Sequence, residues 1–321
     1  MDLPSQLPSE NKKLFVIMNP NAGAQQQGFW WVRRLLGIKD INHTFNGKED
    51  LMSGIIQIFN THGFDASGGF TDAPGHATKL AKKAVMEGVE TIVAVGGDGT
   101  INEVVNGMAN TGIALGVIPF GTANVFGLSF NLSMDVETAC LNIINGSKKT
   151  IDLGRINGTY FACMAGVGFD AFVIQKADKK LKKMVGALSY VLVALWEILK
   201  YRFYPIMFTV DNQLTPKKGY FLIISNTKYY GGDFVVAPHA SANDGKLDAC
   251  IFTGRGLLKT IWYGIQMKLG KISSSKDVEV IQCNSIRIRR FGNHSIHADA
   301  EYIGQSPAKI TIAKEALTIV Q

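Results

Sequence analysis

A glycine-rich segment with one carboxylate, Gly96-Gly97-Asp98-Gly99-Thr100, is the part of this sequence that most directly indicates chemistry. Glycines let backbone N–H groups approach an anion, and the dipole of a following helix favours negative charge at its N-terminus. Asp98 would repel a bound phosphate unless a divalent cation lay between them, which points to magnesium. The segment therefore predicts a phosphate site, although its spacing matches neither the Walker nor the GxGxxG pattern and a purely structural turn stays open.

Two further polar turns follow apolar runs in the same way. Residues 19–23 and 119–124 come after the runs at 14–18 and 113–118, as the glycine-rich segment comes after residues 91–95. Helical periodicity separates these runs at residues 47–62, 77–87 and 101–108. Strands that alternate with helices predict a covered parallel sheet, and such sheets bind ligands at the carboxyl ends of their strands. We therefore expect the three turns to share one cleft.

The second half of the chain has a different pattern. It contains short β-prone runs at residues 160–164, 206–210, 220–225, 246–252, 285–290 and 309–312. Two helical segments interrupt them, at residues 176–200 and 256–270. We therefore expect an α/β domain over residues 1–148 and a β-rich domain over residues 149–312.

The composition is that of a folded protein with anionic partners. Its 321 residues, 46% hydrophobic and 18% charged, exclude disorder and suggest about two domains. The net charge of +7 suits nucleotide phosphates, nucleic acid or an anionic membrane, but without a known nucleic-acid-binding pattern we expect no nucleic acid partner. The four cysteines stand singly, so neither a disulfide framework nor a zinc site is expected.

The location of the protein is also constrained by its apolar segments. Residues 1–13 lack the apolar core of a secretory signal. The longest apolar stretch, residues 184–199, is shorter than the ~20 residues that span a bilayer. We therefore expect a cytoplasmic protein without a transmembrane helix.

Residues 96–107, GGDGTINEVVNG, resemble the catalytic domain of the diacylglycerol kinase and sphingosine kinase superfamily, most closely the bacterial YegS-like soluble lipid kinases. GGDGT is shared with NAD kinases, and its continuation favours the lipid kinases. Further blocks of the family occur in the expected order: NPNAG at 19–23, GHATKLA at 75–81, PFGTANVFG at 119–127, IDLG at 151–154, GVGFDA at 166–171, YYGGDFVVAPHASANDGKLD at 229–248 and HADAEYI at 297–303. The resemblance spans residues 14–303.

The resemblance implies a fold and a reaction. The N-terminal domain would be Rossmann-like, of the NAD kinase and diacylglycerol kinase type, and the C-terminal domain a β-rich sandwich. The resemblance also allows residues 313–321 to complete the first domain. ATP would donate its γ-phosphate to a lipid hydroxyl in the cleft between the domains, with Mg²⁺ present.

The resemblance also implies the site residues. Those implied for nucleotide binding are Asn19, Thr71, Gly96, Gly97, Asp98, Gly99, Thr100, Ile101, Asn102, Thr122 and Asn124. Asp299 fits a general base, because a carboxylate can accept the proton of the lipid hydroxyl. Asp98 and Glu301 would hold magnesium, supported by Asp152. Asp244, with the backbone carbonyls of Ser241 and Lys246, resembles a second magnesium site.

One departure from the family pattern keeps alternatives open. Position 300 is Ala where the family usually has Gly, in its DGE segment. If that turn needs a positive φ, alanine costs about 1 kcal/mol and shifts Asp299 relative to Glu301. A catalytically degenerate lipid- or nucleotide-binding protein therefore stays open, and the shared GGDGT keeps a NAD kinase-like small-molecule kinase open.

Two basic and aromatic segments, residues 176–196 and 257–272, fit a membrane surface. Aromatic rings sit at headgroup depth and lysines attract anionic lipids, although core packing and a solvated helix face explain the same patterns. A lipid kinase has to reach a substrate in a bilayer, so we expect peripheral contact with an anionic membrane. A homodimer stays open.

Overall fold

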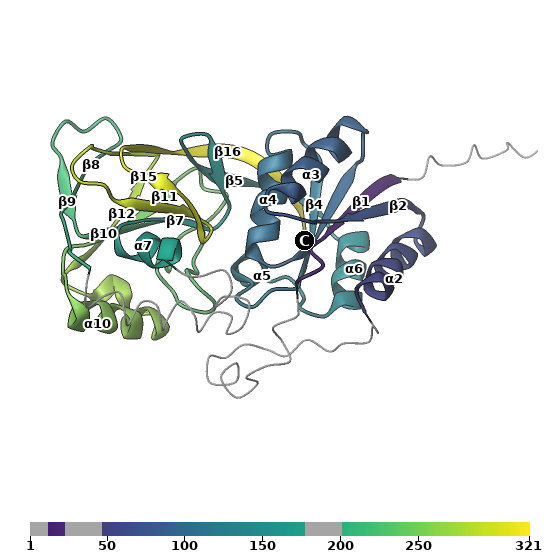
Figure 1. Ribbon diagram of the computed structural model, residues 1–321, viewed down its shortest axis with the longest axis horizontal. Helices are drawn as coiled ribbons and strands as arrows, with labels where there is room; N and C mark the ends of the chain where they lie inside the picture. The colour runs from purple at the N-terminus through teal and green to yellow at the C-terminus, as the bar shows by residue number, and fades with distance from the viewer. Residues whose placement is uncertain (1–11, 23–46, 177–200) are drawn as a thin grey trace, which may run out of the picture.

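The computed structural model describes residues 12–22, 47–176 and 201–321. It consists of an α/β half and a β-rich half that lie side by side (Figure 1). The last strand, β16 (Ala308–Val320), runs from the β-rich half into the α/β half.

Four parallel strands form the centre of the α/β half. Their order is β2 (Phe64–Phe70), β1 (Lys12–Met18), β3 (Thr91–Gly96) and β4 (Ala114–Pro119). Alternate residues of a strand serve the two faces: Val16 and Val93 pack with one pair of helices, and Ile17 and Ala94 with the other. The continuous apolar runs seen in the sequence are what strands buried on both faces require.

The helices cover the two faces of this sheet in pairs (Figure 1). One pair is α2 (Lys48–Thr61) with α6 (Val136–Asn145), and the other is α3 (His76–Met86) with α4 (Asp98–Met108). The predicted helices correspond to α2, α3 and α4, but α6 and the short α5 (Val125–Ser129) were not predicted. A local signal for α6 was present, because Asp135 caps it by accepting the N–H of Thr138 at 2.9 Å.

Two sheets pack face to face in the β-rich half. The first contains, in order, β12 (Val278–Cys283), β11 (Leu247–Phe252), β10 (Phe221–Ser225), β7 (Met164–Val167), β14 (Ser295–Ala298) and β15 (Glu301–Gln305). The second contains β16 with β13 (Ser285–Ile288), β8 (Ile206–Val210), β9 (Lys217–Gly219), β5 (Lys148–Ile156) and β6 (Thr159–Phe161). Leu222, Ile251 and Ile296 of the first sheet meet Phe208, Ile286 and Ile310 of the second in one core.

Strand β16 joins the two halves by hydrogen bonds. Along its length it pairs with β13 and β5, and near its end Thr318 and Ile319 pair in parallel with Ala114 and Leu115 of β4. One sheet is therefore continuous through both halves. This continuity fixes the α/β half against the β-rich half at the level of the backbone.

Helices α7 (Phe169–Lys176) and α10 (Leu257–Lys268) lie on the outer face of the six-stranded sheet (Figure 1). Tyr263 and Met267 of α10 are buried in one apolar cluster with Phe221 and Phe252 of the sheet. Most of the helix predicted at residues 176–200, and the apolar stretch at 184–199, lie outside the described residues. Of the helices within the described parts of the chain, none has both the length and the apolar character that crossing a membrane requires.

Candidate active site

The polar turns meet at the carboxyl ends of β1, β3 and β4. The side-chain amide of Asn19 donates to the hydroxyl of Thr100 at 3.1 Å, and the backbone N–H of Asn19 donates to Val95. Gly97 and Gly121 touch so closely that a Cβ on Gly121 would overlap the Cα of Gly97. The glycines therefore bring two turns together in a space where side chains do not fit.

Three predicted nucleotide-binding residues complete this edge. Thr71 follows β2, and its N–H donates to the carbonyl of Met18. Asn124 directly precedes α5 and has a φ of 47°. Its side chain closes the neighbouring turn, because Oδ1 accepts the N–H of Gly121 and the amide donates to the carbonyl of Gly121. Thr122 lies in that same turn. Backbone N–H groups and small polar side chains thus gather at one sheet edge, which suits an anion.

Asp98 is the first residue of α4 and faces the β-rich half. Its Oδ1 accepts the N–H of Phe126 at 3.0 Å. Burial raises the pKa of Asp98, and the charge of Asp299 adds to this rise, while the N–H groups of Phe126 and Val125 oppose it. Asp98 and Asp299, from opposite halves of the molecule, are thus close enough to repel each other.

Asp299 lies at the end of β14 and is held by four donors. Its Oδ1 accepts the N–H groups of Cys163 at 3.0 Å and Met164 at 2.9 Å. Its Oδ2 accepts the N–H of Ala162 at 2.7 Å and the side-chain amide of Asn102 at 2.8 Å. Burial raises the pKa of Asp299, and these hydrogen bonds oppose the rise because they favour the ionised form.

The contacts of Asp299 limit how it can act as a base. A carboxylate offers about four acceptor positions, and four donors already occupy those of Asp299. Three of the donors are backbone groups, and Asn102 is the one side chain among them. Asn102, predicted among the nucleotide-binding residues, therefore contacts the candidate base through its side-chain amide.

Glu301 and Ala300 complete the turn that begins with Asp299. The side chain of Glu301 reaches the glycine-rich segment, where a Cβ on Gly99 would lie 3.1 Å from Glu301 Oε1. Asp299 and Ala300 have φ angles of 44° and 62°, so the turn does require the left-handed conformation that glycine adopts most easily. The chain nevertheless places Asp299 beside Asp98 with alanine at position 300.

A cavity of about 510 Å³ lies where these groups meet. Asp98 and Asp299 line one part of it, and the remaining lining is mostly apolar and comes from α7, α10 and β10: Phe169, Val173, Phe221, Leu257, Ile261 and Met267. A volume of this size is typical of ligand sites, which range over roughly 300–1,000 Å³. The cavity thus joins a pair of carboxylates to an apolar chamber.

The acidic groups here fit a magnesium ion that is completed by other ligands. Within residues 12–22, 47–176 and 201–321, no three His, Cys, Asp or Glu side chains lie together as a metal-binding group. Magnesium, however, is commonly held by one or two carboxylates together with substrate phosphates and water. Asp98 and Glu301 both lie at the glycine-rich segment, where phosphate oxygens would supply the remaining ligands.

Asp152, predicted to support the catalytic network, does not line the cavity and binds two backbone groups, and its role stays a prediction. Its Oδ2 accepts the N–H of Gly245 at 2.7 Å and its Oδ1 the N–H of Glu315 at 2.8 Å. In the loop that contains Gly245, Asp244 accepts the N–H of Lys246 at 2.9 Å, and the hydroxyl of Ser241 donates to Asn243. Burial raises the pKa of nearby Asp248 to about 6, and the charge of Asp244 adds to this rise. The second magnesium site at Asp244, Ser241 and Lys246 stays a prediction.

Several residues of the quoted sequence blocks have contacts that the sequence analysis did not predict. The carboxylate of Glu103 accepts the N–H groups of Gly75 and Ala77 at the start of α3, so this residue is structural. Asp170, Tyr230 and His297 line the cavity, although they were given no catalytic or binding role. Their blocks, GVGFDA, YYGGDF and HADAEYI, were the available signal, but only the fold shows that they meet.

Comparison with known proteins agrees with this arrangement. Residues 41–156 match the diacylglycerol kinase catalytic domain, and residues 163–321 match the YegS C-terminal NAD kinase beta sandwich-like domain. The chain is 31% identical over 261 residues to the diacylglycerol kinase of Bacillus subtilis, covering 80% of this chain and 86% of that protein. It is 27% identical to the diacylglycerol kinase of Staphylococcus aureus, covering 92% and 88% of the two chains.

Solved structures show the same fold. A crystal structure of a diacylglycerol kinase from Bacillus anthracis superposes with a TM-score of 0.69 at 22% identity and covers 97% of both chains. The fold and the domain matches define a two-domain protein with a diacylglycerol kinase catalytic domain and a β-sandwich, which confirms the predicted fold class. The chain belongs to the diacylglycerol kinase family, among its YegS-like lipid kinases.

Proposed function

We propose that this protein transfers the γ-phosphate of ATP to the hydroxyl group of a membrane lipid such as a diacylglycerol. The observation that carries the proposal is the cavity in which Asp98 and Asp299 adjoin an apolar chamber. The apolar part suits acyl chains, and the carboxylates lie where the hydroxyl end of such a lipid would meet the nucleotide phosphates. The relatives named diacylglycerol kinase support this substrate class.

The residues of the candidate site would have three roles: binding the nucleotide, accepting the proton and holding magnesium. The N–H groups of residues 96–100, with Asn19, Thr71, Thr122 and Asn124, would hold the nucleotide. Asp299 would accept the proton of the lipid hydroxyl after the amide of Asn102 gives up its hydrogen bond to Oδ2. Asp98 and Glu301 would hold magnesium, which neutralises charge on the transferred phosphoryl group.

The lining of the cavity distinguishes this proposal from a NAD kinase-like activity. A dinucleotide acceptor carries phosphates and riboses that need polar partners, whereas α7, α10 and β10 supply Phe169, Val173, Phe221, Ile261 and Met267. Buried apolar side chains would leave the polar groups of a dinucleotide without hydrogen bonds. A lipid therefore fits this chamber better.

The direct test follows label from γ-labelled ATP into a mixed lipid extract with magnesium, with NAD offered in a parallel reaction. Wild type is expected to label a lipid and not NAD, and Asp299→Asn is expected to label neither. Labelled NAD would favour the small-molecule kinase. ATP binding without any transfer would favour the degenerate protein, and Ala300→Gly would then show whether the altered turn is the cause.

We further propose that the protein is cytoplasmic and that α10 brings it to an anionic membrane. Five apolar side chains on or just after this helix are exposed by 44–82%: Leu258, Ile261, Trp262, Ile265 and Leu269. Leu257 and Ile261 also line the cavity, so the exposed face adjoins the route by which a lipid would enter. A bilayer covers such a face and provides the substrate at the same place.

Two of the lysines predicted to attract lipid headgroups are already paired. Lys259 Nζ lies 2.6 Å from Asp277, and Lys268 Nζ lies 2.6 Å from Asp233. The apolar side chains are therefore expected to contribute more than these charges. The segment at residues 176–196 lies for the most part outside the described residues.

The membrane proposal is tested by sedimentation with vesicles that contain an anionic lipid. Leu258→Gln combined with Trp262→Gln is expected to lower vesicle binding about tenfold or more. Two apolar side chains that become partly buried in the bilayer contribute a few kcal/mol to the free energy of binding. Leu214→Gln is the matched control, because Leu214 is 91% exposed and does not line the cavity. Equal binding by wild type and the double variant would contradict the role of α10.

A further inference from the structure

The turn that presents Asp299 and Glu301 needs support from outside itself. Asp299 and Ala300 are consecutive non-glycine residues with φ angles of 44° and 62°, a conformation that L-residues disfavour. Such a backbone persists where surrounding contacts determine it. Asp299 is determined by the N–H groups of residues 162–164 and by its own N–H, which donates to the carbonyl of Met164 at 2.9 Å.

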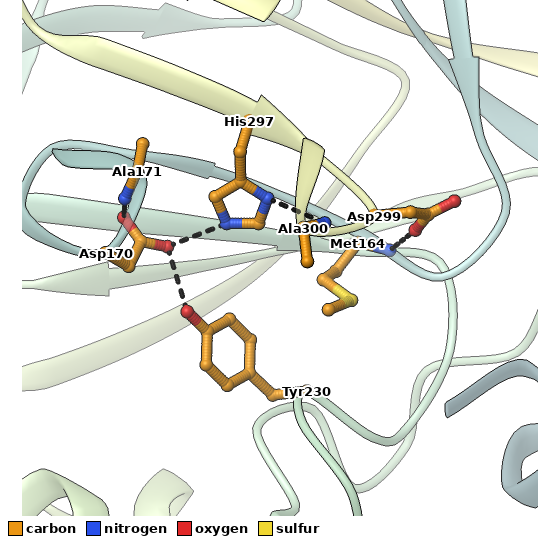
Figure 2. Close-up of polar contacts among 7 residues, drawn as sticks. All are labelled: Met164, Asp170, Ala171, Tyr230, His297, Asp299 and Ala300. Atoms are coloured by element: carbon orange, nitrogen blue, oxygen red, sulfur yellow. Dashed lines mark hydrogen bonds and ion pairs between the residues drawn. The ribbon is translucent and has the colours of Figure 1, made fainter. Parts of the chain in front are cut away.

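Ala300 is held differently, by a histidine. Its backbone N–H donates to Nδ1 of His297 at 3.3 Å, so Nδ1 is the unprotonated nitrogen of the ring (Figure 2). The proton of the neutral ring is then on Nε2, which faces Asp170 Oδ2 at 3.1 Å. The His297 side chain is completely buried, and the pairing with Asp170 sets both its tautomer and its orientation.

Asp170 is itself fixed in place. Its Oδ1 accepts the N–H of Ala171 at 2.8 Å, and its Oδ2 also accepts the hydroxyl of Tyr230 at 3.3 Å (Figure 2). These contacts come from the start of α7 and from the loop after β10. Two separate segments thus fix the carboxylate that meets Nε2, on the side of the His297 ring away from the turn.

A glycine makes room for this pair. Gly166 of β7 is the register partner of His297, and a Cβ at position 166 would overlap both Asp170 Oδ2 and His297 Nε2. Its backbone has no positive φ, so the requirement for glycine is one of space. Neither the nucleotide role nor the magnesium role was assigned to Gly166, Asp170 or His297.

We propose that His297, oriented by Asp170 in the space left by Gly166, positions the Asp299–Glu301 turn for catalysis. The inference rests on the proposed function for its kinetic readout and adds positioning residues to it. His297 lines the cavity, and we infer that it acts on the turn through the N–H of Ala300. Fixing that amide keeps Asp299 directed at the cavity and Glu301 at Gly99 while alanine occupies position 300.

Two substitutions of His297 separate the two ring nitrogens. His297→Asn keeps an acceptor near the position of Nδ1 and loses the contact with Asp170, whereas His297→Gln keeps a donor near Nε2 and loses the acceptor for Ala300. We expect His297→Gln to lower kcat about 10- to 100-fold with little change in the KM for ATP, because small displacements of reacting groups cost this much. We expect His297→Asn to lower kcat less than fivefold.

Rescue is the sharper part of the test. Ala300→Gly reduces the need for support, since glycine adopts the left-handed conformation readily. His297→Gln combined with Ala300→Gly is therefore expected to recover most of the lost kcat. Gly166→Ala is expected to resemble His297→Gln, and His294→Asn, which alters another buried histidine whose ring contacts Phe291, is the control. Equal losses in both His297 variants without rescue would overturn the proposal.

A second readout does not depend on activity. Hydrogen exchange of the Ala300 amide, followed in peptides that cover residues 295–305, is expected to be about tenfold faster in His297→Gln than in His297→Asn. Unchanged exchange in His297→Gln would overturn the positioning role. If wild type phosphorylates no lipid, the proposed function fails, and this exchange measurement still decides whether His297 holds the turn.

Discussion

Two turns supply the acidic groups of the candidate site, and they are built in opposite ways. The turn at residues 96–100 is local: it joins β3 to α4, and its glycines leave the space in which it touches the turn after β4. The turn at residues 299–301 depends on distant contacts, because Asn102, the N–H groups of residues 162–164, and Asp170 through His297 hold it.

This difference suggests that the turn at residues 96–100 serves nucleotide binding and that the turn at residues 299–301 serves the acceptor. A turn fixed by contacts within the α/β half suits the binding of a nucleotide, which is common to many kinases. A turn that strands and side chains of the second half hold together with Asn102 can place its carboxylates according to the acceptor that this half binds. Breaking the two turns is therefore expected to affect different kinetic constants.

The largest effect is expected from the two carboxylates themselves. Asp98→Asn and Asp299→Asn are each expected to lower kcat about 10³-fold, because each removes a charge that the reaction uses directly. Radiolabel transfer into lipid measures this loss, and thermal unfolding checks that the variants remain folded. A variant that keeps more than a tenth of the wild-type kcat would exclude that carboxylate from the chemistry.

The local turn is tested at its closest contact. Gly121→Ala pushes against the Cα of Gly97, and backbone atoms cannot move aside without displacing the phosphate turn. We expect the KM for ATP to rise about tenfold and the free energy of unfolding to fall by about 2 kcal/mol. An unchanged KM for ATP would show that the contact between the two turns does not shape the nucleotide site.

Gly107→Ala is the matched substitution, at the far end of the sequence block that contains Gly97. A Cβ on Gly107 would lie 2.6 Å from Ala81 Cβ and 2.7 Å from the carbonyl oxygen of Thr78, where α4 packs on α3. We expect the free energy of unfolding to fall by about 1–2 kcal/mol with an unchanged KM for ATP. Denaturant unfolding measures the loss of stability, and steady-state kinetics measure the KM for ATP. A raised KM for ATP would contradict a purely structural role for Gly107.

The smallest effect concerns the attachment of α10. Asp277 bonds Lys259 and the hydroxyl of Tyr263, and its pKa is lowered chiefly by Lys259. A lowered pKa adds stability above the ordinary value of 3.8 and loses it as the pH falls. Asp277→Asn is therefore expected to cost about 0.5–1 kcal/mol at pH 7 and progressively less below pH 4.

Unfolding of wild type and Asp277→Asn at a series of pH values measures this difference. A cost that persists unchanged at low pH would show that the carboxylate charge is not what fastens α10 to the strands beneath it.

The sequence predicted the elements whose signals are local. Apolar runs that end in glycine or asparagine turns located β1, β3 and β4, and helical periodicity located α2, α3 and α10. The order of the family blocks predicted the two-domain fold, which the domain matches and the solved structures confirm. The sequence also indicated that the turn at position 300 could need a positive φ, because the family usually has glycine there.

The contacts around Asp299 had no local signal. Its backbone donors are more than 130 positions away in the chain. Asp170 is likewise more than 120 positions away from His297, with which it pairs. A glycine that only leaves space, such as Gly166, resembles any other glycine in the sequence. For Asp152 the motif suggested a role in supporting catalysis, which stays a prediction, and only the fold shows that its carboxylate accepts the N–H groups of Gly245 and Glu315.

The central claim is that the two turns form one catalytic site, and a double-mutant cycle tests it most directly. The rate of phosphate transfer from ATP to lipid is measured for wild type, Asp98→Asn, Asp299→Asn and the double variant. Residues that act as a unit show strongly non-additive losses. A shared site predicts that the rate for the double variant is about the same as the rate for the less active single variant. Losses that multiply in the double variant would contradict a shared site.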